Sequence, residues 1–172
     1  TWACDSADPP ISGVVQTLFG ADVPTVPAVT DTDAVELGTV FTVAKPGHVT
    51  ALLYYKGAGS TGTHRGTLWS ATGQQLASVT FDAETASGWQ RAVVSTPVLV
   101  TPGNTYVVSY FAPNGGFATT GGYFAEPRVS GDIVGPATDN GRYIYGSNGG
   151  FPTTSFNATA YFADVQVDFG PA

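Results

Sequence analysis

The sequence predicts an all-β protein, an antiparallel two-sheet β-sandwich and, within that class, a jelly roll. The first observation is composition: 22 Gly and 12 Pro accompany many strand-forming residues, whereas Met is absent and only 11% of residues are charged. The second is a series of short apolar runs separated by turn residues. The third is periodicity, because no segment keeps a 3.6-residue apolar repeat over ten or more positions.

Nine segments have the composition of strands, and turn residues separate them. Lys45-Pro46-Gly47 and Thr101-Pro102-Gly103-Asn104 suit tight turns, because Pro fixes φ and Gly accepts positive φ. Such short connections predict that neighbouring strands pair as antiparallel hairpins. The predicted strands are residues 36–44, 48–56, 65–70, 75–82, 89–100, 105–112, 122–125, 142–145 and 160–169.

The last predicted strand alternates in polarity. Asp164, Gln166 and Asp168 share one face with Phe162, whereas the apolar residues between them share the other. Successive side chains of a strand point to opposite faces of the sheet. We therefore expect this strand to have a buried side and a side exposed to water.

The chain divides into two regions. Residues 1–30 contain several prolines and few periodic apolar positions, which predicts a linker-like segment that packs partly on the body through Leu18 and Phe19. Residues 31–172 are expected to form a single β-sandwich domain. A stretch rich in glycine and aromatic residues, 113–154, is the least regular part, and long loops of this kind often carry function.

Charge and cysteine content restrict the partners and the compartment. The formal net charge of −7 repels nucleic acid and anionic membranes, and no apolar stretch approaches the ~20 residues of a membrane span. A composition rich in Thr, Ser, Gly and Asn is common in extracellular β-proteins, so we expect a secreted, extracellular protein. Cys4 is the single cysteine. It is either an incidental thiol or a link to a neighbouring domain or chain.

Several motifs occur in the order found in a known bacterial family. They are Tyr54–Gly57, Gly62–Ser70, Glu84–Gln90, Thr105–Tyr110 and the closing Tyr161–Phe169. Through them the chain resembles the bacterial domain-of-unknown-function family 4082 over nearly its whole body. The resemblance implies an accessory module of secreted, multi-domain bacterial proteins, often beside immunoglobulin-like or carbohydrate-active domains. It implies no particular activity or site.

Five acidic residues are candidates for a calcium site. Asp31, Asp33 and Glu36 fall within six residues before or at the start of the first core strand, and Asp164 and Asp168 follow in the last strand. Calcium takes oxygen ligands from carboxylates and carbonyls, so a structural calcium ion is expected if the two strands are neighbours. The alternative is a set of solvated acids at a strand edge.

Catalysis has few candidate residues. The sequence has no Gly-x-Ser-x-Gly motif and only two histidines, of which His64 lies in a polar segment. An enzyme would use His64 with Glu84 or Asp82 as its acid. The alternative is that His64 is a hydrogen-bonding turn residue.

Aromatic residues are the remaining functional signal. Trp69 and Trp89 lie in or beside strands, where an indole usually packs in the core. Tyrosines of the glycine-rich region are better placed to be exposed, and sugars bind to aromatic faces with polar side chains around them. The predicted ligand-binding residues are Tyr123, Asp139, Arg142, Tyr143, Tyr145 and Asn148.

These observations favour a non-catalytic extracellular accessory module that binds carbohydrate, with a glycan or a cell-surface polymer as its partner. A structural or adhesive module that contacts neighbouring domains or another protein is the second hypothesis. An enzyme based on His64 is the third. Nucleic-acid binding and membrane insertion are not expected.

Overall fold

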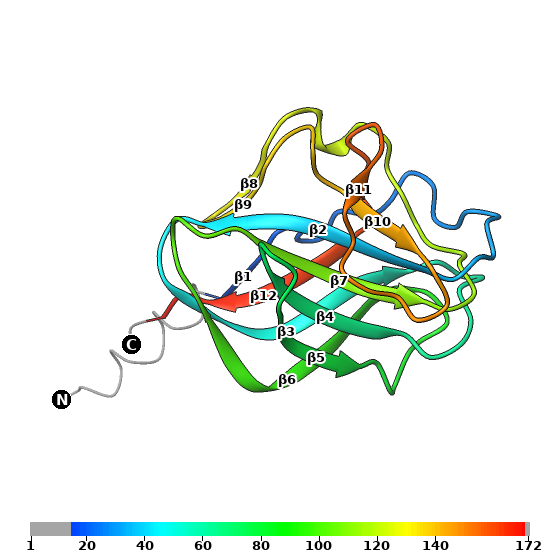
Figure 1. Cartoon of the computed structure of the whole chain (residues 1–172), viewed down its shortest axis with the longest axis horizontal. Coiled ribbons are helices and arrows are strands. Elements are labelled where there is room, and N and C mark those ends of the chain that lie inside the picture. Colours follow the sequence, from blue (N-terminus) through cyan, green and yellow to red (C-terminus); the bar gives the residue numbers. More distant parts are fainter. Residues whose placement is uncertain (1–14, 171–172) are drawn as a thin grey trace.

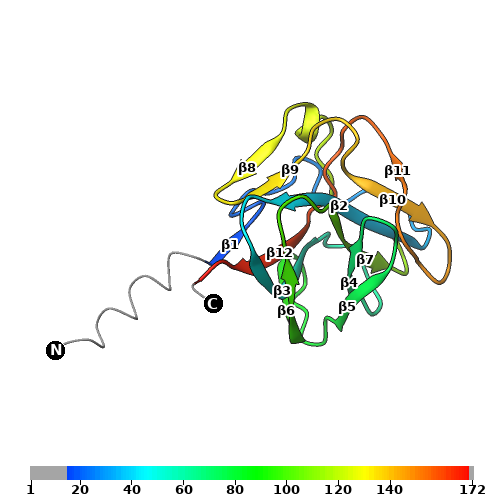
Figure 2. The ribbon, with the colours of Figure 1, turned by 60° about the vertical axis from the view of Figure 1, so that its left-hand side comes forward.

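The computed structural model describes residues 15–170. Cys4, for which the sequence leaves open an incidental thiol or a cross-link, lies outside this range. Two antiparallel sheets pack face to face (Figures 1 and 2). The strands are β1 (Val15–Thr17), β2 (Val35–Val43), β3 (Gly47–Lys56), β4 (Arg65–Ser70), β5 (Gln75–Thr80), β6 (Gly88–Val100), β7 (Tyr106–Ala112), β8 (Arg128–Ser130), β9 (Ile133–Gly135), β10 (Arg142–Tyr145), β11 (Thr154–Ser155) and β12 (Ala163–Asp168).

The strand order confirms the predicted antiparallel sandwich. One sheet has the order β1-β12-β3-β6, and the other has the order β11-β10-β2-β7-β4-β5. The short strands β8 and β9 form a hairpin whose second strand pairs with the end of β2. This order is consistent with a jelly roll, in which the first and last strands are neighbours, and the jelly-roll assignment stays a prediction.

Most predicted strands are present within a few residues of their expected bounds. The prediction for residues 122–125 is wrong, because Tyr123–Ala125 form a short 3-10 turn preceded by Gly122 at a φ of 72°. A left-handed residue at this position turns the chain out of an extended path. The strands that the sequence analysis missed, β1, β8, β9 and β11, have three residues or fewer.

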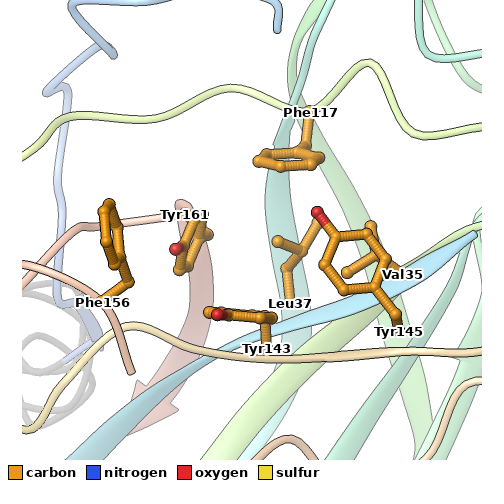
Figure 3. A pocket seen from close by; sticks show the side chains of 7 residues that line it. All are labelled: Val35, Leu37, Phe117, Tyr143, Tyr145, Phe156 and Tyr161. Carbon is orange, nitrogen blue, oxygen red and sulfur yellow. The ribbon is translucent and has the colours of Figure 1, made fainter. Parts of the chain in front are cut away.

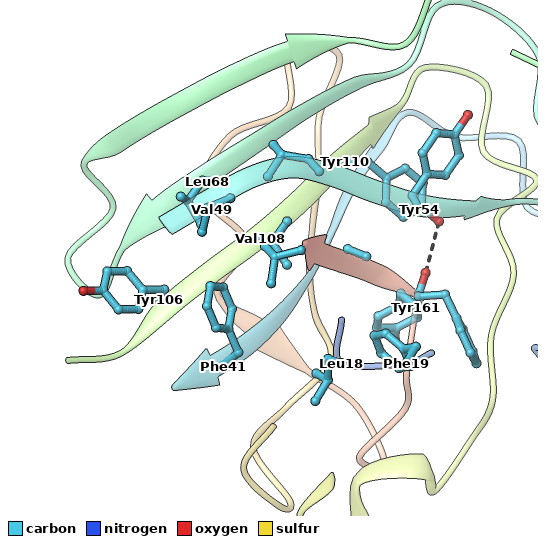
Figure 4. Packing of buried hydrophobic residues seen from close by; sticks show 14 of the residues in the cluster. Leu18, Phe19, Phe41, Val49, Tyr54, Leu68, Tyr106, Val108, Tyr110 and Tyr161 are labelled. Carbon is cyan, nitrogen blue, oxygen red and sulfur yellow. Dashed lines mark hydrogen bonds between the residues drawn. The ribbon is translucent and has the colours of Figure 1, made fainter. Parts of the chain in front are cut away.

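The core lies between the two sheets and contains large aromatic side chains. Tyr54 from β3 stacks on Tyr110 from β7 with ring centroids 4.4 Å apart, so the contact joins the two sheets. The Tyr110 hydroxyl donates to the carbonyl oxygen of Tyr161 at 3.3 Å (Figure 4). This bond holds the chain just before β12 against β7 of the opposite sheet.

The N-terminal part of the described chain belongs to the body. β1 pairs with β12, and the next two residues, Leu18 and Phe19, are fully buried. Their backbone N–H groups donate to the carboxylate of Asp164 at 2.8 and 2.9 Å. Asp164 is therefore buried, although the alternation of the last strand predicted that its side of the strand would be exposed to water.

The side chain of Asn140 hydrogen-bonds the backbone of β2 at a position that neither β9 nor β10 pairs with. β9 pairs with the end of β2 and β10 with its start, and between them the side-chain amide of Asn140 bonds both the N–H and the C=O of Val40, at 2.7 and 2.9 Å. Gly141 follows at a φ of 75°, and a Cβ there would lie 1.5 Å from the Thr159 carbonyl oxygen. Asn140 and Gly141 together determine where β10 begins.

Candidate functional site

A pocket of about 240 Å³ opens beside β2 and β10, and we call it the aromatic pocket. Aromatic rings from several segments surround it, with Phe156 and Tyr161 on one side and Phe117 and Tyr145 on the other (Figure 3). Its lining residues are Val35, Leu37, Phe117, Tyr143, Tyr145, Phe156 and Tyr161.

Strand pairing places four of these side chains. Tyr143 lies opposite Leu37 and Tyr145 lies opposite Val35 in the β2–β10 ladder. Residues two apart in a strand share a face, so both tyrosines stand over the two apolar residues. Val35 and Leu37 are fully buried and form an apolar floor.

A tight turn displays Phe156 at the mouth of the pocket. Asn157 and Ala158 have φ values of 53° and 49°, and the Thr159 N–H donates to the Phe156 carbonyl at 3.0 Å. Phe156 is 59% exposed. Non-glycine residues in the left-handed region are strained, and such strain is often found at functional sites.

The tyrosine rings contact one another edge to face. The centroids of Tyr143 and Tyr145 are 5.7 Å apart at 73°, and those of Tyr143 and Tyr161 are 6.2 Å apart at 77°. Phe117 adds a similar contact to Tyr161 at 5.7 Å. Burial raises the pKa of Tyr161 to about 12, so its hydroxyl is neutral at ordinary pH. The pocket therefore offers apolar ring surface and neutral hydroxyl groups.

Asp31 holds the outer tyrosine. The Tyr145 hydroxyl donates to Asp31 Oδ2, and Asp31 Oδ1 accepts the backbone N–H of Asp33 at 2.9 Å. These two bonds lower the pKa of Asp31 below its ordinary value, the bond from Tyr145 most strongly. The same bond, together with burial, raises the pKa of Tyr145. The pair joins the loop before β2 to the wall of the pocket.

A second polar cluster is buried near the loop that precedes β4. Ser60 Oγ lies 2.8 Å from His64 Nε2, and Glu84 Oε2 lies 2.9 Å from His64 Nδ1. Lys56 Nζ lies 2.7 Å from the other Glu84 oxygen. Burial lowers the pKa of His64, and the Glu84 carboxylate acts in the opposite direction. The sequence analysis named Glu84 or Asp82 as the acid of His64 only under its enzyme hypothesis, and it missed Ser60, four residues earlier in the same loop.

The chemistry open to this cluster depends on access to Ser60. Ser, His and Glu at these distances match the residue types of an acyl-transfer triad. A nucleophile must reach its substrate, however, and Ser60 is only 1% exposed. Its Oγ also lies 2.7 Å from the Gly115 carbonyl oxygen, to which it donates. In this conformation the cluster joins three loops through hydrogen bonds, and the third hypothesis, an enzyme based on His64, stays a prediction.

Comparison with known proteins assigns the family. The family described as Domain of unknown function (DUF4082) matches residues 21–163 of the 172-residue chain. The chain belongs to the DUF4082 family. The resemblance seen in the sequence is thereby confirmed. No curated protein matches the chain.

The DUF4082 domain brings together only part of the predicted ligand-binding set. Tyr143 and Tyr145 line the aromatic pocket. Tyr123 instead packs on Phe19 with centroids 5.2 Å apart and donates its hydroxyl to Asp22 at 2.7 Å. The glycine-rich region therefore contributes one tyrosine to the packed interior and two to the pocket.

The predicted polar partners lie outside the lining of the pocket. Arg142 Nη2 lies 3.2 Å from Asp139 Oδ2, and Asp139 also accepts the Ser155 hydroxyl at 2.8 Å. The carbonyl of Asn148 accepts a bond from Arg65 at 3.1 Å. These residues stabilise the β10–β11 hairpin and the loop between its strands.

The sequence analysis missed several residues of the pocket. Phe156 could have been found, because it is an isolated aromatic residue between the polar residues Ser155 and Asn157. Tyr161 carries no such signal, because it lies between Ala160 and Phe162 in a predicted strand, where it also suits a core. Phe117 lies in the glycine-rich region 113–154 but was not among the predicted ligand-binding residues. Asp31, a predicted metal ligand, accepts the hydroxyl of Tyr145 in the pocket wall, a contact that the sequence did not indicate.

The DUF4082 domain holds the five predicted metal ligands in separate places. Asp31 and Asp33 are neighbours, whereas Glu36 lies on β2 and Asp164 and Asp168 lie on β12, in the other sheet. Within residues 15–170, no three His, Cys, Asp or Glu side chains are grouped so that they could hold a metal ion. This arrangement does not identify a site for the predicted structural calcium, which stays a prediction.

The buried acids have other partners. Glu36 accepts the Ser109 hydroxyl at 2.6 Å and lies below the loop at Gly150, whose N–H is 3.4 Å away. Burial raises the pKa of Glu36. Asp164 accepts three backbone N–H groups, and Asp168 accepts that of Gly170 at 2.8 Å. These bonds give Glu36, Asp164 and Asp168 partners within the domain, and the metal site predicted for them stays a prediction.

No helix in the described part of the chain is both long and apolar enough to cross a membrane.

Proposed function

We propose that this DUF4082 domain is a non-catalytic module of a secreted protein and that it binds carbohydrate in the aromatic pocket. The observation that carries the proposal is the composition of the lining, which has five aromatic rings, two aliphatic side chains and no charged side chain. Sugar rings present C–H groups to aromatic faces and hydroxyl groups to polar atoms.

The size of the pocket supports a small ligand unit. Pockets for drug-sized ligands are roughly 300–1,000 Å³. The aromatic pocket, at about 240 Å³, is below this range and suits a single ring. One shallow site of this kind gives weak binding, and tethering to other modules of a longer protein raises the avidity.

The charge distribution supports a neutral ligand. The chain has a net charge of −7, and Asp31, next to the pocket, is held in its ionised form by its bond from Tyr145. A sulfated or uronic-acid-rich polymer would be repelled. We therefore propose neutral glycans or neutral cell-surface polymers as partners.

A thermal-melt screen against soluble neutral glycans tests the proposal. A ligand that binds only the folded state raises the melting temperature once its concentration exceeds its dissociation constant. A glycan that raises the melting temperature is then titrated by calorimetry against the Tyr143→Ala variant. We expect that variant to lose about tenfold in affinity, roughly 1.4 kcal/mol.

Leu99→Ala is the matched control, because Leu99 is 55% exposed on β6 in the other sheet. It should bind like the wild type. A flat response to every glycan would reject the proposal and favour a structural or adhesive module. Melts in calcium and in EDTA, run in the same screen, test the predicted structural calcium.

A further inference from the structure

A second hollow borders the aromatic pocket. This hollow has a volume of about 350 Å³, and we call it the polar pocket. It shares Phe117, Phe156 and Tyr161 with the aromatic pocket, so the three rings form a common wall between the two. Its remaining lining residues are Thr119, Gly121, Asn157 and Thr159.

The two hollows differ in chemistry. Beyond the shared rings, the aromatic pocket adds tyrosines and aliphatic residues, whereas the polar pocket adds two hydroxyls and an amide. Thr119 and Asn157 both line the polar pocket, where Thr119 is half-buried and Asn157 is exposed. Polar side chains at the surface of a pocket can bind the hydroxyl groups of a ligand.

The backbone around the polar pocket is held rigidly. Thr120 and Ala160 form an antiparallel bridge with N–H to O=C distances of 3.0 and 2.9 Å. The Gly122 N–H donates to the Asn157 carbonyl at 3.1 Å, and the Phe124 N–H donates to the Ala158 carbonyl at 2.9 Å. These bonds hold the strained turn that presents Phe156. A preformed site loses little conformational entropy on binding.

Because the two pockets are adjacent and share three aromatic rings, we infer that the ligand is a neutral oligosaccharide of at least two sugar units. One unit stacks in the aromatic pocket, and the next unit passes Phe156 and hydrogen-bonds in the polar pocket. The inference rests on the proposed carbohydrate-binding function and specifies its substrate class. It gives Asn157 the role of a specificity-determining residue for the second unit.

A length series of neutral sugars tests this inference. Glucose, cellobiose and cellotriose form one series, and mannose, mannobiose and mannotriose form another. In a series that binds, we expect the affinity measured by calorimetry to rise about tenfold from one unit to two, because the second pocket becomes occupied. A trimer of galacturonic acid, which carries negative charge, is expected to bind more weakly than a neutral trimer.

The Asn157→Gly variant separates the two pockets. Glycine removes the amide and accepts the φ of 53° at this position, so the turn is preserved. The variant should bind the disaccharide as weakly as the monosaccharide and leave monosaccharide affinity unchanged. Asn148→Gly is the control, because Asn148 is exposed and lies outside both linings.

The outcomes distinguish the inference from the proposed function. Equal affinity for one and two units, or an unchanged disaccharide affinity in Asn157→Gly, would overturn the two-unit inference and leave carbohydrate binding intact. Preferential binding of the acidic trimer would overturn the assignment of a neutral ligand. If neither series nor any glycan of the screen bound, the proposed function would fail and the inference with it.

Discussion

Tyr145 is the residue at which the aromatic pocket meets the charged surface of the domain. Its ring is 48% exposed at the pocket wall, and its hydroxyl donates to the carboxylate of Asp31. A hydrogen bond to an ionised acceptor is roughly twice as strong as a neutral one. The bond therefore holds the ring of Tyr145 in one orientation in the free protein. Less conformational entropy is then lost when a ligand binds.

We predict that Asp31→Asn weakens binding of the neutral disaccharide by roughly threefold. The amide keeps the shape of the side chain but removes the charge that strengthens the bond from Tyr145. Titration calorimetry at constant ionic strength measures the change. Asp33→Asn removes the same charge from an exposed neighbour whose carboxylate does not contact the pocket, and it should leave the affinity unchanged.

The pH dependence of this contact follows from the pKa of Asp31. The pKa is lowered from 3.8, chiefly by the bond from Tyr145, so Asp31 is ionised throughout the range above about pH 4. The contribution of the bond is present throughout that range and is lost only as the pH falls through the lowered pKa. We expect disaccharide affinity to be flat between pH 5 and 8, and a decline within that interval would contradict the assigned role of Asp31.

At the scale of elements, the attachment of β1 depends on one carboxylate. β1 has three residues and forms an edge of its sheet. Such a short strand has little stability of its own. Asp164 on β12 accepts the N–H groups of Leu18 and Phe19 directly after β1, so a side chain supplies the acceptors that a longer strand would provide.

We predict that Asp164→Ala lowers the free energy of unfolding by about 2–4 kcal/mol. The substitution leaves two fully buried backbone donors and the N–H of Val165 without their acceptor, and an unsatisfied buried donor costs about 1–3 kcal/mol. Chemical denaturation measures the loss. Hydrogen exchange should show faster exchange at residues 15–19 before the rest of the domain opens.

The control for this prediction lies in the same strand. Asp168 accepts one N–H, from Gly170, and is less buried than Asp164. Asp168→Ala should cost less than about 1 kcal/mol. Equal losses in the two variants would show that Asp164 does not anchor the N-terminal segment.

At the scale of the whole molecule, folding encloses an acid below a loop. Glu36 lies at the start of β2, between Ser109 of β7 and Gly150 of the loop that follows β10. It is 1% exposed, and burial raises its pKa above 4.5. The native state therefore binds a proton more readily at this site than the unfolded chain does. The stability that Glu36 contributes is greatest below pH 4.5 and is lost as the pH rises through the raised pKa.

We predict that Glu36→Gln stabilises the domain at pH 7 and that its advantage narrows toward pH 4.5. Glutamine can accept the Ser109 hydroxyl without carrying a buried charge. The gain should be on the order of 1 kcal/mol, or about 2–4 °C in Tm for a chain of this length. Glu126→Gln, at an exposed position, should show no comparable change. The measured quantity is the difference in the free energy of unfolding between Glu36→Gln and the wild type at each pH. A gain that is smaller at pH 7 than at pH 4.5 would refute the prediction.

Part of the candidate site could be predicted and part could not, for different physical reasons. Tyr143 and Tyr145 were predictable because they occur two residues apart in a short strand within an irregular, glycine-rich region. Tyr161 was not, because an aromatic residue in an apolar strand gives the same local pattern whether it lines a pocket or fills a core. Phe117 lies in the same glycine-rich region as the tyrosines, but only the fold decides which aromatic residues of that region line a pocket. The contact between Asp31 and Tyr145 could not be predicted, because the two residues lie 114 positions apart in the sequence.

The sequence by itself determined the class of fold and most of its strands. Alternating apolar runs and Pro-Gly turns are local signals, and they act within the strand that carries them. The tertiary structure alone decided which strands are neighbours, that Asp164 is buried, and that Phe117, Phe156 and Tyr161 stand between two pockets. These features depend on contacts between residues distant along the chain, because burial and pocket shape are set by packing rather than by the neighbours in sequence.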